Sequence, residues 1–208
     1  MNAPFAVALS ARRVSRCGGF TMLEVLVALL ILLVGLLGLA GLLVTTQQGE
    51  VEAYQHKQAT VLLQDMLDRI RANPQAAGSG GQCYAFTTNA STGIPSLGTG
   101  NAVDATFVCG AGSVTQQQRG AADLRAWNNA LLGTSEKKGT AQVGALIDAR
   151  GCVVNPSSGL YIVSVAWRGL RPTVAPPAVY TCGINLYTDE RLRRVLSVSV
   201  RLANLTAP

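Results

Sequence analysis

The sequence predicts an α+β protein in which a long N-terminal helix leads into an antiparallel β-sheet. Three observations predict this class. Residues 25–44 are Val, Leu, Ile, Ala or Gly without exception, and an apolar stripe of helical spacing follows at residues 59–70. Beyond residue 140, short runs rich in β-branched residues alternate between apolar and polar side chains, as strands with one buried face do.

The apolar run is long enough to cross a membrane. As an α-helix it spans roughly 30 Å, the thickness of the hydrocarbon core of a bilayer. Arg12, Arg13 and Arg16 precede the run, whereas Glu50 and Glu52 follow it. Because positive charge favours the cytoplasmic side, we expect a transmembrane segment at about residues 24–45, with the N-terminus inside and the bulk of the chain outside.

A secretory signal peptide and a plain anchor are the simplest alternatives. The run is longer than the apolar core of about 7–15 residues in a signal peptide, and only Ala40-Gly41 offers a weak cleavage site after it. Neither alternative explains Glu24, which stands directly before the run. A carboxylate there is costly unless it is interfacial or paired, so Glu24 is a functional candidate.

The residues around Glu24 resemble a known processing signal. The stretch Gly19-Phe20-Thr21-Met22-Leu23-Glu24 with its apolar run is similar to the type III signal of type IV pilins and type II secretion pseudopilins. The resemblance implies a pilin-like fold and a basic leader, residues 1–19, that a prepilin peptidase removes. It also implies cleavage between Gly19 and Phe20, N-methylation of Phe20, and a Glu24 that offsets the terminal amine of a neighbouring subunit.

The helix is expected to continue beyond the apolar run as the spine of a head domain. Its stripe consists of Ala59, Leu62, Leu63, Met66, Leu67 and Ile70. Pro74 should end the helix near Asn73, because proline lacks the amide donor and restricts the residue before it. The expected organisation is therefore a cleaved leader (1–19), a long helix (20–73) and a periplasmic head (74–208).

Three glycines lie inside the apolar run, at positions 35, 38 and 41. Their spacing could provide a face on which helices pack closely. Each glycine also weakens a helix interior by about 1 kcal/mol relative to alanine. Both interpretations stay open from the sequence, including whether this part of the helix melts when subunits assemble.

The head is expected to contain a loop region at residues 78–115, with a short strand at 106–108, followed by a helix at 116–132. In that helix Leu124, Trp127, Asn128 and Leu131 lie on one side, with Trp127 as a core anchor. The stretch from Asp123 to Trp127 resembles a segment of PilV-type minor pilins. Strands are expected at 142–147, 152–154, 160–167, 179–187 and 192–202, giving a four-stranded sheet, give or take one.

The cysteines indicate an oxidising compartment. Removing the leader removes Cys17 and leaves Cys83, Cys109, Cys152 and Cys182 in the exported part. Four cysteines allow three connectivities, of which the neighbour pairs Cys83–Cys109 and Cys152–Cys182 are our first choice, while buried free thiols are the alternative. None of the spacings is typical of a zinc site or a redox CxxC motif.

No motif in the sequence predicts catalysis, a metal site or a cofactor. The one histidine, His56, is expected to be solvated, and Asp65 and Asp68 belong to a solvated helix face. Arginines at positions 168, 171, 191, 193, 194 and 201 could form a basic patch near the final hairpin, although solvated strand edges that resist aggregation are the favoured interpretation. After loss of the leader, 14 basic residues face 11 acidic ones, so nucleic-acid binding is not expected.

The resemblance implies the function of a minor pilin of the inner membrane. Such a protein would prime pilus assembly in a tip complex with other minor pilins and the major pilin, and would support twitching motility and cell adhesion. The alternatives are a minor pseudopilin of a type II secretion system and a membrane-anchored adhesin with a ligand site on residues 78–115. The size of the head, residues 74–208, favours the minor pilin over a short pseudopilin.

Overall fold

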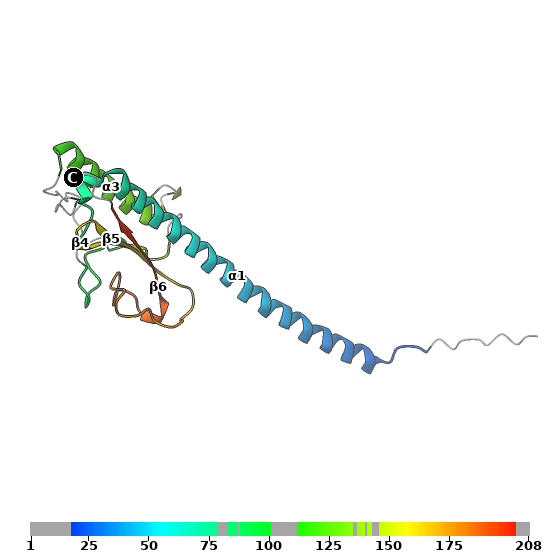
Figure 1. Cartoon of the computed structure of the whole chain (residues 1–208). Coiled ribbons are helices and arrows are strands. Elements are labelled where there is room, and N and C mark those ends of the chain that lie inside the picture. Colours follow the sequence, from blue (N-terminus) through cyan, green and yellow to red (C-terminus); the bar gives the residue numbers. More distant parts are fainter. Residues whose placement is uncertain are drawn as a thin grey trace, which may run out of the picture. The chain divides into compact units, whose positions relative to one another are not determined.

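The computed structural model describes residues 18–78, 83–86, 88–100, 112–134, 137–139, 141–142 and 146–202. The chain forms two compact units, Met1–Thr46 and Gln47–Pro208. The elements, shown in Figure 1, are α1 (Met22–Ala72), α2 (Pro74–Gly78), β1 (Leu97–Gly98), α3 (Val114–Leu131), β2 (Lys137–Lys138), β3 (Ala141–Gln142), β4 (Arg150–Ser157), β5 (Leu160–Arg168), a 3-10 turn η1 (Glu190–Leu192) and β6 (Arg193–Arg201). The protein therefore has the α+β, pilin-like architecture that the sequence predicts.

In the first unit, residues 25–44 of α1 are apolar on every side of the helix. Every described residue of this unit is exposed. Among the described residues, α1 is the one helix whose length and composition would let it cross a membrane. A helix that is apolar all round needs an apolar environment, either a protein core or a lipid bilayer. Around Gly35, Gly38 and Gly41, no atom of the chain lies within 4 Å of the place of a Cβ, so the glycine face is open to another molecule.

The second unit is built on an antiparallel sheet with the strand order β1-β4-β5-β6. The central strand β5 pairs with β4 through Val163↔Val153 and with β6 through Val163↔Val198. Val163, Val165 and Tyr161 are fully buried on the same face of β5, as the period of two requires. Strands β2 and β3 pair with each other in a separate two-stranded antiparallel sheet.

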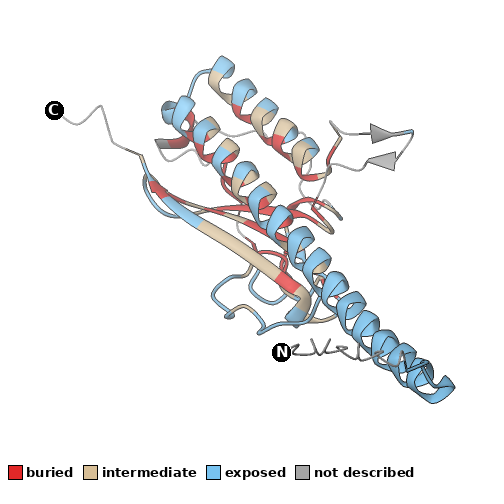
Figure 2. Cartoon of the chain, turned by 90° about the vertical axis from the view of Figure 1, so that its right-hand side faces the viewer, coloured by how far each residue is buried: buried red, intermediate tan, exposed pale blue. Residues whose placement is uncertain are grey.

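The second half of α1 and the helix α3 cover one face of this sheet (Figure 2). The expected stripe on α1 is confirmed, because all of its members except the half-buried Leu62 are buried. Trp127 of α3 is fully buried and donates its indole N–H to the Leu62 carbonyl oxygen at 2.8 Å. This bond ties α3 to α1, so the expectation that Trp127 anchors the core is confirmed.

The opposite face of the sheet is covered by the segment that follows β5. Cys182 forms a disulfide with Cys152 of β4, with an S–S distance of 2.08 Å. A Cβ on Gly183 would lie 3.4 Å from the Cβ of Ala166 in β5, which shows how closely the segment crosses the sheet. Cys83 is also disulfide-bonded; its expected partner, Cys109, lies outside the described residues.

The prediction of a strand at 179–187 is wrong, because this segment forms consecutive turns. Gly183 and Asn185 have positive φ angles of 69° and 59°, which a strand does not accommodate. The disulfide holds the segment over the face of the sheet, where it cannot pair at an edge. The fourth strand of the sheet is instead the two-residue β1, which pairs with β4 from within the expected loop region.

Other expectations hold in part. The helix expected at 116–132 begins at Val114, after an N-cap at Ser113 that forms a capping box with Gln116. The strands expected at 152–154, 160–167 and 192–202 correspond to β4, β5 and β6. Val198 of β6 is 40% exposed because β6 is an edge strand. The strand expected at 142–147 is found only in part. Residue 142 belongs to β3, residues 146–147 lie outside any strand, and residues 143–145 are not described. The strand expected at 106–108 also lies outside the described residues.

The contact between β4 and α3 leaves no room for a side chain at Gly151. A Cβ there would lie 2.4 Å from a ring carbon of Trp127 and 2.6 Å from Leu131. We expect Gly151→Ala to lower the free energy of unfolding by about 1–3 kcal/mol through overpacking. Urea denaturation of the chain in mild detergent, followed by near-ultraviolet circular dichroism, measures the change.

Gly120→Ala is the matched control, because Gly120 lies inside α3 and its Cβ would meet Cys83 at an ordinary 3.4 Å. Alanine is favoured over glycine in a helix interior by about 1 kcal/mol. This variant should therefore be as stable as the parent or slightly more stable. Equal destabilisation of both variants would contradict the close packing of Gly151 against Trp127.

Candidate functional site

The candidate site is the N-terminal segment at the beginning of α1. Residues 18–21 are not helical, and α1 begins at Met22. The hydroxyl of Thr21 accepts a hydrogen bond from the Glu24 N–H at 3.2 Å, and the Thr21 carbonyl oxygen accepts from the N–H groups of Glu24 and Val25. Thr21 is therefore the N-cap residue, and it satisfies amides that a helix otherwise leaves without partners.

The Gly19–Phe20 peptide bond lies in an accessible, non-helical stretch. Gly18, Gly19 and Phe20 are exposed, and no atom lies within 4 Å of the place of a Cβ at either glycine. A protease must approach the backbone closely, and glycine leaves the most room for that approach. The cap at Thr21 keeps this bond outside the hydrogen-bonded part of the helix.

Glu24 lies in the first turn of α1. A carboxylate there interacts favourably with the positive end of the helix dipole. Its side chain is exposed and makes no ion pair within the part of the chain that the structure describes. Phe20, Glu24, Val25, Ala28, Leu29 and Leu32 line a hollow of about 450 Å³. Among the described residues of that lining, Glu24 is the one charged side chain, so these residues present a single carboxylate on an otherwise apolar surface.

Sequence reasoning identified Gly19, Phe20 and Glu24 but missed the capping role of Thr21. The signal is present in the sequence, because Thr21 and Glu24 have the spacing of a capping box. The structure contains the half of that motif in which the threonine hydroxyl binds the Glu24 amide. The other half of a capping box would bind the Glu24 carboxylate to the Thr21 N–H. The structure has no such bond, so the carboxylate is available at the surface.

Comparison with known families agrees with this geometry. Residues 14–40 match the family model described as the prokaryotic N-terminal methylation motif. The matched residues include the Gly19–Phe20 bond and Glu24, and the match supports a type IV pilin-like protein that is a substrate of a prepilin peptidase. Searches of curated proteins and of solved structures found no similar chain.

The arginines near the final hairpin do not form the basic patch considered from the sequence. Four of the six take part in ion pairs, which are Arg168–Asp148, Arg191–Asp189, Arg193–Glu190 and Arg194–Glu52. Hydrogen bonds from Arg191 lower the pKa of the Asp189 carboxyl below its usual value. The interpretation as solvated strand edges is wrong for Arg193, whose side chain is completely buried.

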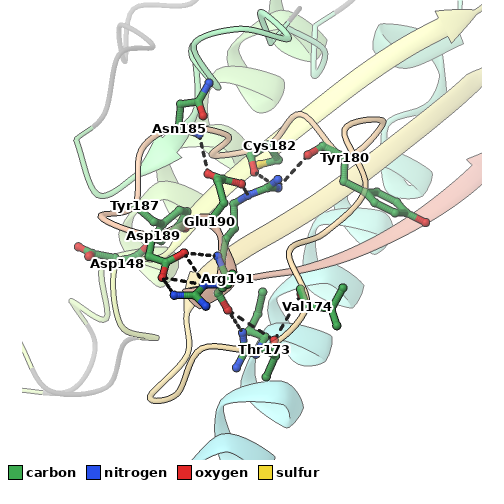
Figure 3. Close-up of polar contacts among 12 residues, drawn as sticks. Asp148, Thr173, Val174, Tyr180, Cys182, Asn185, Tyr187, Asp189, Glu190 and Arg191 are labelled. Carbon is green, nitrogen blue, oxygen red and sulfur yellow. Dashed lines mark hydrogen bonds and ion pairs between the residues drawn. The ribbon is translucent and has the colours of Figure 1, made fainter.

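Arg193 holds the segment that crosses the sheet, whose residues Tyr180, Cys182 and Asn185 are labelled in Figure 3. Its Nε donates to the Glu190 carboxylate at 2.6 Å, and its Nη1 donates to the carbonyl oxygens of Tyr180 and Cys182 at 2.8 and 3.3 Å. The other carboxylate oxygen of Glu190 accepts from the Asn185 N–H at 2.7 Å. The segment forms turns and does not pair with a strand, so these bonds from Arg193 and Glu190 supply partners for its backbone carbonyl and N–H groups.

A second polar network lies between α1 and α3. Tyr84 donates its hydroxyl to Asp123 at 2.7 Å, and Asp123 also pairs with Arg69, which in turn pairs with Asp65. Burial, together with the hydrogen bond to Asp123, raises the pKa of Tyr84. Asp65 is half-buried and takes part in a network that connects two helices, so the expectation of a solvated helix face holds only in part for Asp65 and is confirmed for the exposed Asp68.

The structure brings no catalytic set of residues together in its described part. His56 is exposed, as expected, with its ring edge against Trp167 at 5.9 Å between centroids. No group of three or more His, Cys, Asp or Glu side chains suited to a metal ion occurs among the described residues.

The Glu190–Arg193 pair provides a test of how this segment is held. In Glu190→Gln, an amide NH₂ replaces one of two oxygens that both accept hydrogen bonds, and the buried guanidinium loses its counter-charge. We expect the free energy of unfolding to fall by roughly 2–4 kcal/mol. Denaturant titration of the oxidised protein measures it.

Asp189→Asn is the matched control. Asp189 neighbours Glu190 and pairs with an arginine, but that pair is exposed and asparagine can still accept the capping bond from the Arg191 N–H. Exposed ion pairs contribute little, so this variant should resemble the parent. If the Glu190→Gln protein is as stable as the control, the Glu190 carboxylate does not stabilise the buried Arg193.

Proposed function

We propose that this chain is a minor pilin, made as a precursor and stored in the inner membrane until it joins a pilus. The observation that supports this best is the coincidence at the start of α1. An accessible Gly19–Phe20 bond, a capped helix start and a lone Glu24 carboxylate all fall within the matched methylation motif. The first half of α1, at about residues 24–45, would span the membrane, with the leader in the cytoplasm and the head in the periplasm.

Processing would convert the segment into an assembly interface. Prepilin peptidase would remove residues 1–19 and N-methylate Phe20, which leaves a positive amine one residue before the helix cap. A positive charge at a helix N-terminus is unfavourable. The Glu24 carboxylate of a neighbouring subunit would offset this charge as the apolar helices leave the lipid and pack together.

Within the pilin-like proteins, the size of the head and the α3 helix with Trp127 favour a PilV-type minor pilin. Such a subunit would act in a tip complex with other minor pilins and the major pilin, and would support pilus biogenesis, twitching motility and adhesion. A minor pseudopilin of a type II secretion system is the second candidate, since it shares the N-terminal signal. Deletion of the gene separates the two, because loss of twitching supports the pilin and loss of protein secretion supports the pseudopilin.

Cleavage can be tested directly on the purified protein. In cells with an active prepilin peptidase, the mature chain should begin with N-methylated Phe20, because the bond before it is accessible and non-helical. Mass spectrometry of the intact protein and of its N-terminal peptide measures this. In cells that lack the peptidase, residues 1–19 should remain attached. A chain that keeps its leader in the presence of the peptidase would contradict the proposal.

The assembly role of Glu24 can be tested with Glu24→Gln, which removes the charge and keeps the shape. Cleavage should proceed, whereas incorporation into fibres should fall by about tenfold or more, because a charge pair of even 1–2 kcal/mol is lost from each contact. Immunoblots of sheared fibres and of membranes measure the two fractions. Glu50→Gln is the matched control, since Glu50 is an exposed carboxylate of the same helix beyond the apolar run. Equal incorporation of both variants would rule out charge pairing by Glu24.

A further inference from the structure

Strand β6 forms one edge of the main sheet and is half-buried or exposed along most of its length (Figure 2). The opposite edge is covered, because β1 pairs with β4 and the Phe86 N–H donates to the Val153 carbonyl oxygen at 2.8 Å. Just before β6, the Thr173 N–H donates to the Arg191 carbonyl oxygen at 2.8 Å. From Arg193 onward, β5 is the one strand that pairs with β6 in the described part of the chain.

The register of β5 and β6 shows which backbone groups point away from the sheet. The Gly169 N–H donates to the Leu192 carbonyl oxygen at 2.8 Å, and the two strands keep this register along their length. Because alternate residues form the bonds of an antiparallel pair, the even-numbered residues of β6 bind β5. The outward groups belong to the odd-numbered residues beyond Arg193, which we call the open edge: Val195, Ser197, Ser199 and Arg201. No hydrogen bond to their outward N–H or carbonyl groups occurs within the described residues.

The open edge lacks the features by which proteins usually prevent another strand from pairing at an edge. Proline, a charge that points inward and a β-bulge are such features. Residues 195–200 are Val-Leu-Ser-Val-Ser-Val, without a proline or a charge, and β6 pairs with β5 without a shift in register. Within this stretch the side chain of Val198 is 40% exposed. An exposed, uncharged edge that is rich in β-branched residues is a template for an additional strand.

The side chains of β6 indicate which side chains an added strand would carry. Leu196 and Val198 lie on the face of the sheet that α1 covers, because they pair with buried residues of β5 on that face, so aliphatic side chains fit beside them. Ser197 and Ser199 lie on the opposite face, where small polar side chains fit. Arg201 is exposed, and its side chain makes no ion pair within the described residues, so an acidic residue beside it would form a cross-strand pair.

We propose that the open edge binds an extended segment of another protein, which adds a strand to the four-stranded sheet. The segment alternates aliphatic and small polar side chains and carries an acidic residue beside Arg201. A second copy of β6 fits less well, because β6 contains no acidic residue and would leave Arg201 without a counter-charge. The inference rests on the second unit alone and does not depend on the membrane span or on removal of the leader.

Synthetic peptides test the chemistry of the partner. The probe is a fluorescent peptide that alternates valine and threonine between two glutamates, and its anisotropy measures binding to the full chain in detergent micelles. A control peptide has the same sequence but carries methyl groups on the backbone nitrogens of its central residues. We expect the methylated peptide to bind about tenfold more weakly or worse, because it has lost its hydrogen-bond donors. A peptide with lysine in place of glutamate should also bind more weakly.

Ser199→Pro tests the open edge from the side of the protein. Proline removes an outward N–H that the sheet does not use, and edge strands tolerate proline at such positions. Ser199→Ala is the matched control, because it loses the same hydroxyl group and keeps the N–H. The proline variant should bind the probe about tenfold more weakly, whereas the alanine variant should resemble the parent. Arg201→Glu should reverse the preference, so that the lysine peptide binds better than the glutamate peptide. Near-ultraviolet circular dichroism shows whether each variant keeps the fold.

Binding that requires the peptide amides, the N–H at position 199 and the charge at position 201 supports the proposal. The proposal is overturned if the probe does not bind, if the methylated peptide binds equally well, or if the proline and alanine variants bind alike. Self-association of the chain that Ser199→Pro abolishes and Ser199→Ala preserves also overturns it, since the edge would then belong to a second copy. If Ser199→Pro fails to fold, the comparison of the plain and methylated peptides on the parent chain decides the question.

Discussion

The burial of one stripe of α1 is the constraint on which the rest of the structure depends. The helix carries an apolar run at residues 25–44 and an apolar stripe from Ala59 to Ile70, but the described part of the chain covers only the part between Gln55 and Ile70. There the sheet and α3 remove the stripe from water, and each large aliphatic side chain buried in this way contributes roughly 1.5–3 kcal/mol. The first half of the helix has no such cover, so its surroundings must come from outside the chain.

This division explains how the two halves of the helix can serve different purposes. Residues from Ala59 onward fix the position of the sheet through Trp127 and the core around it. Nothing in the described part of the chain packs on the residues before Thr46. Under the proposed function, these residues would exchange lipid for neighbouring helices, and Glu24 would orient that exchange, since one charge on an apolar surface has few favourable partners.

The parts of the fold governed by periodicity were predictable from the sequence. The stripe on α1, the inward side of α3 and strands β4, β5 and β6 all follow from the spacing of apolar residues. The segment 179–187 could not be predicted in this way. It alternates like a strand, but the Cys152–Cys182 bond and the buried Arg193 place it across the sheet, and both depend on contacts between residues far apart in the sequence.

The candidate site was predictable for a different reason. Gly19, Phe20 and Glu24 are neighbours in the sequence, so their arrangement depends on one helix start and not on tertiary contacts. The capping by Thr21 is equally local and has a recognisable spacing. By contrast, the Tyr84–Asp123–Arg69 network joins three separate parts of the chain, and no spacing in the sequence indicates it.

Strand β5 runs antiparallel to the second half of α1, because Tyr161 at its start donates to the carbonyl oxygen of Ala77, just after α1, while Trp167 near its end contacts His56. This course has a mechanical consequence for the proposed function. A subunit drawn out of a membrane would be pulled along the axis of its helix, and the load would pass into the head through contacts spread from Glu52 to Ala77. Contacts arranged side by side along the direction of force are loaded together in shear, so no single contact carries the load alone. The disulfide lies on the far face of the sheet and is spared that load. The head is thus suited to being moved by its helix without being unravelled by it.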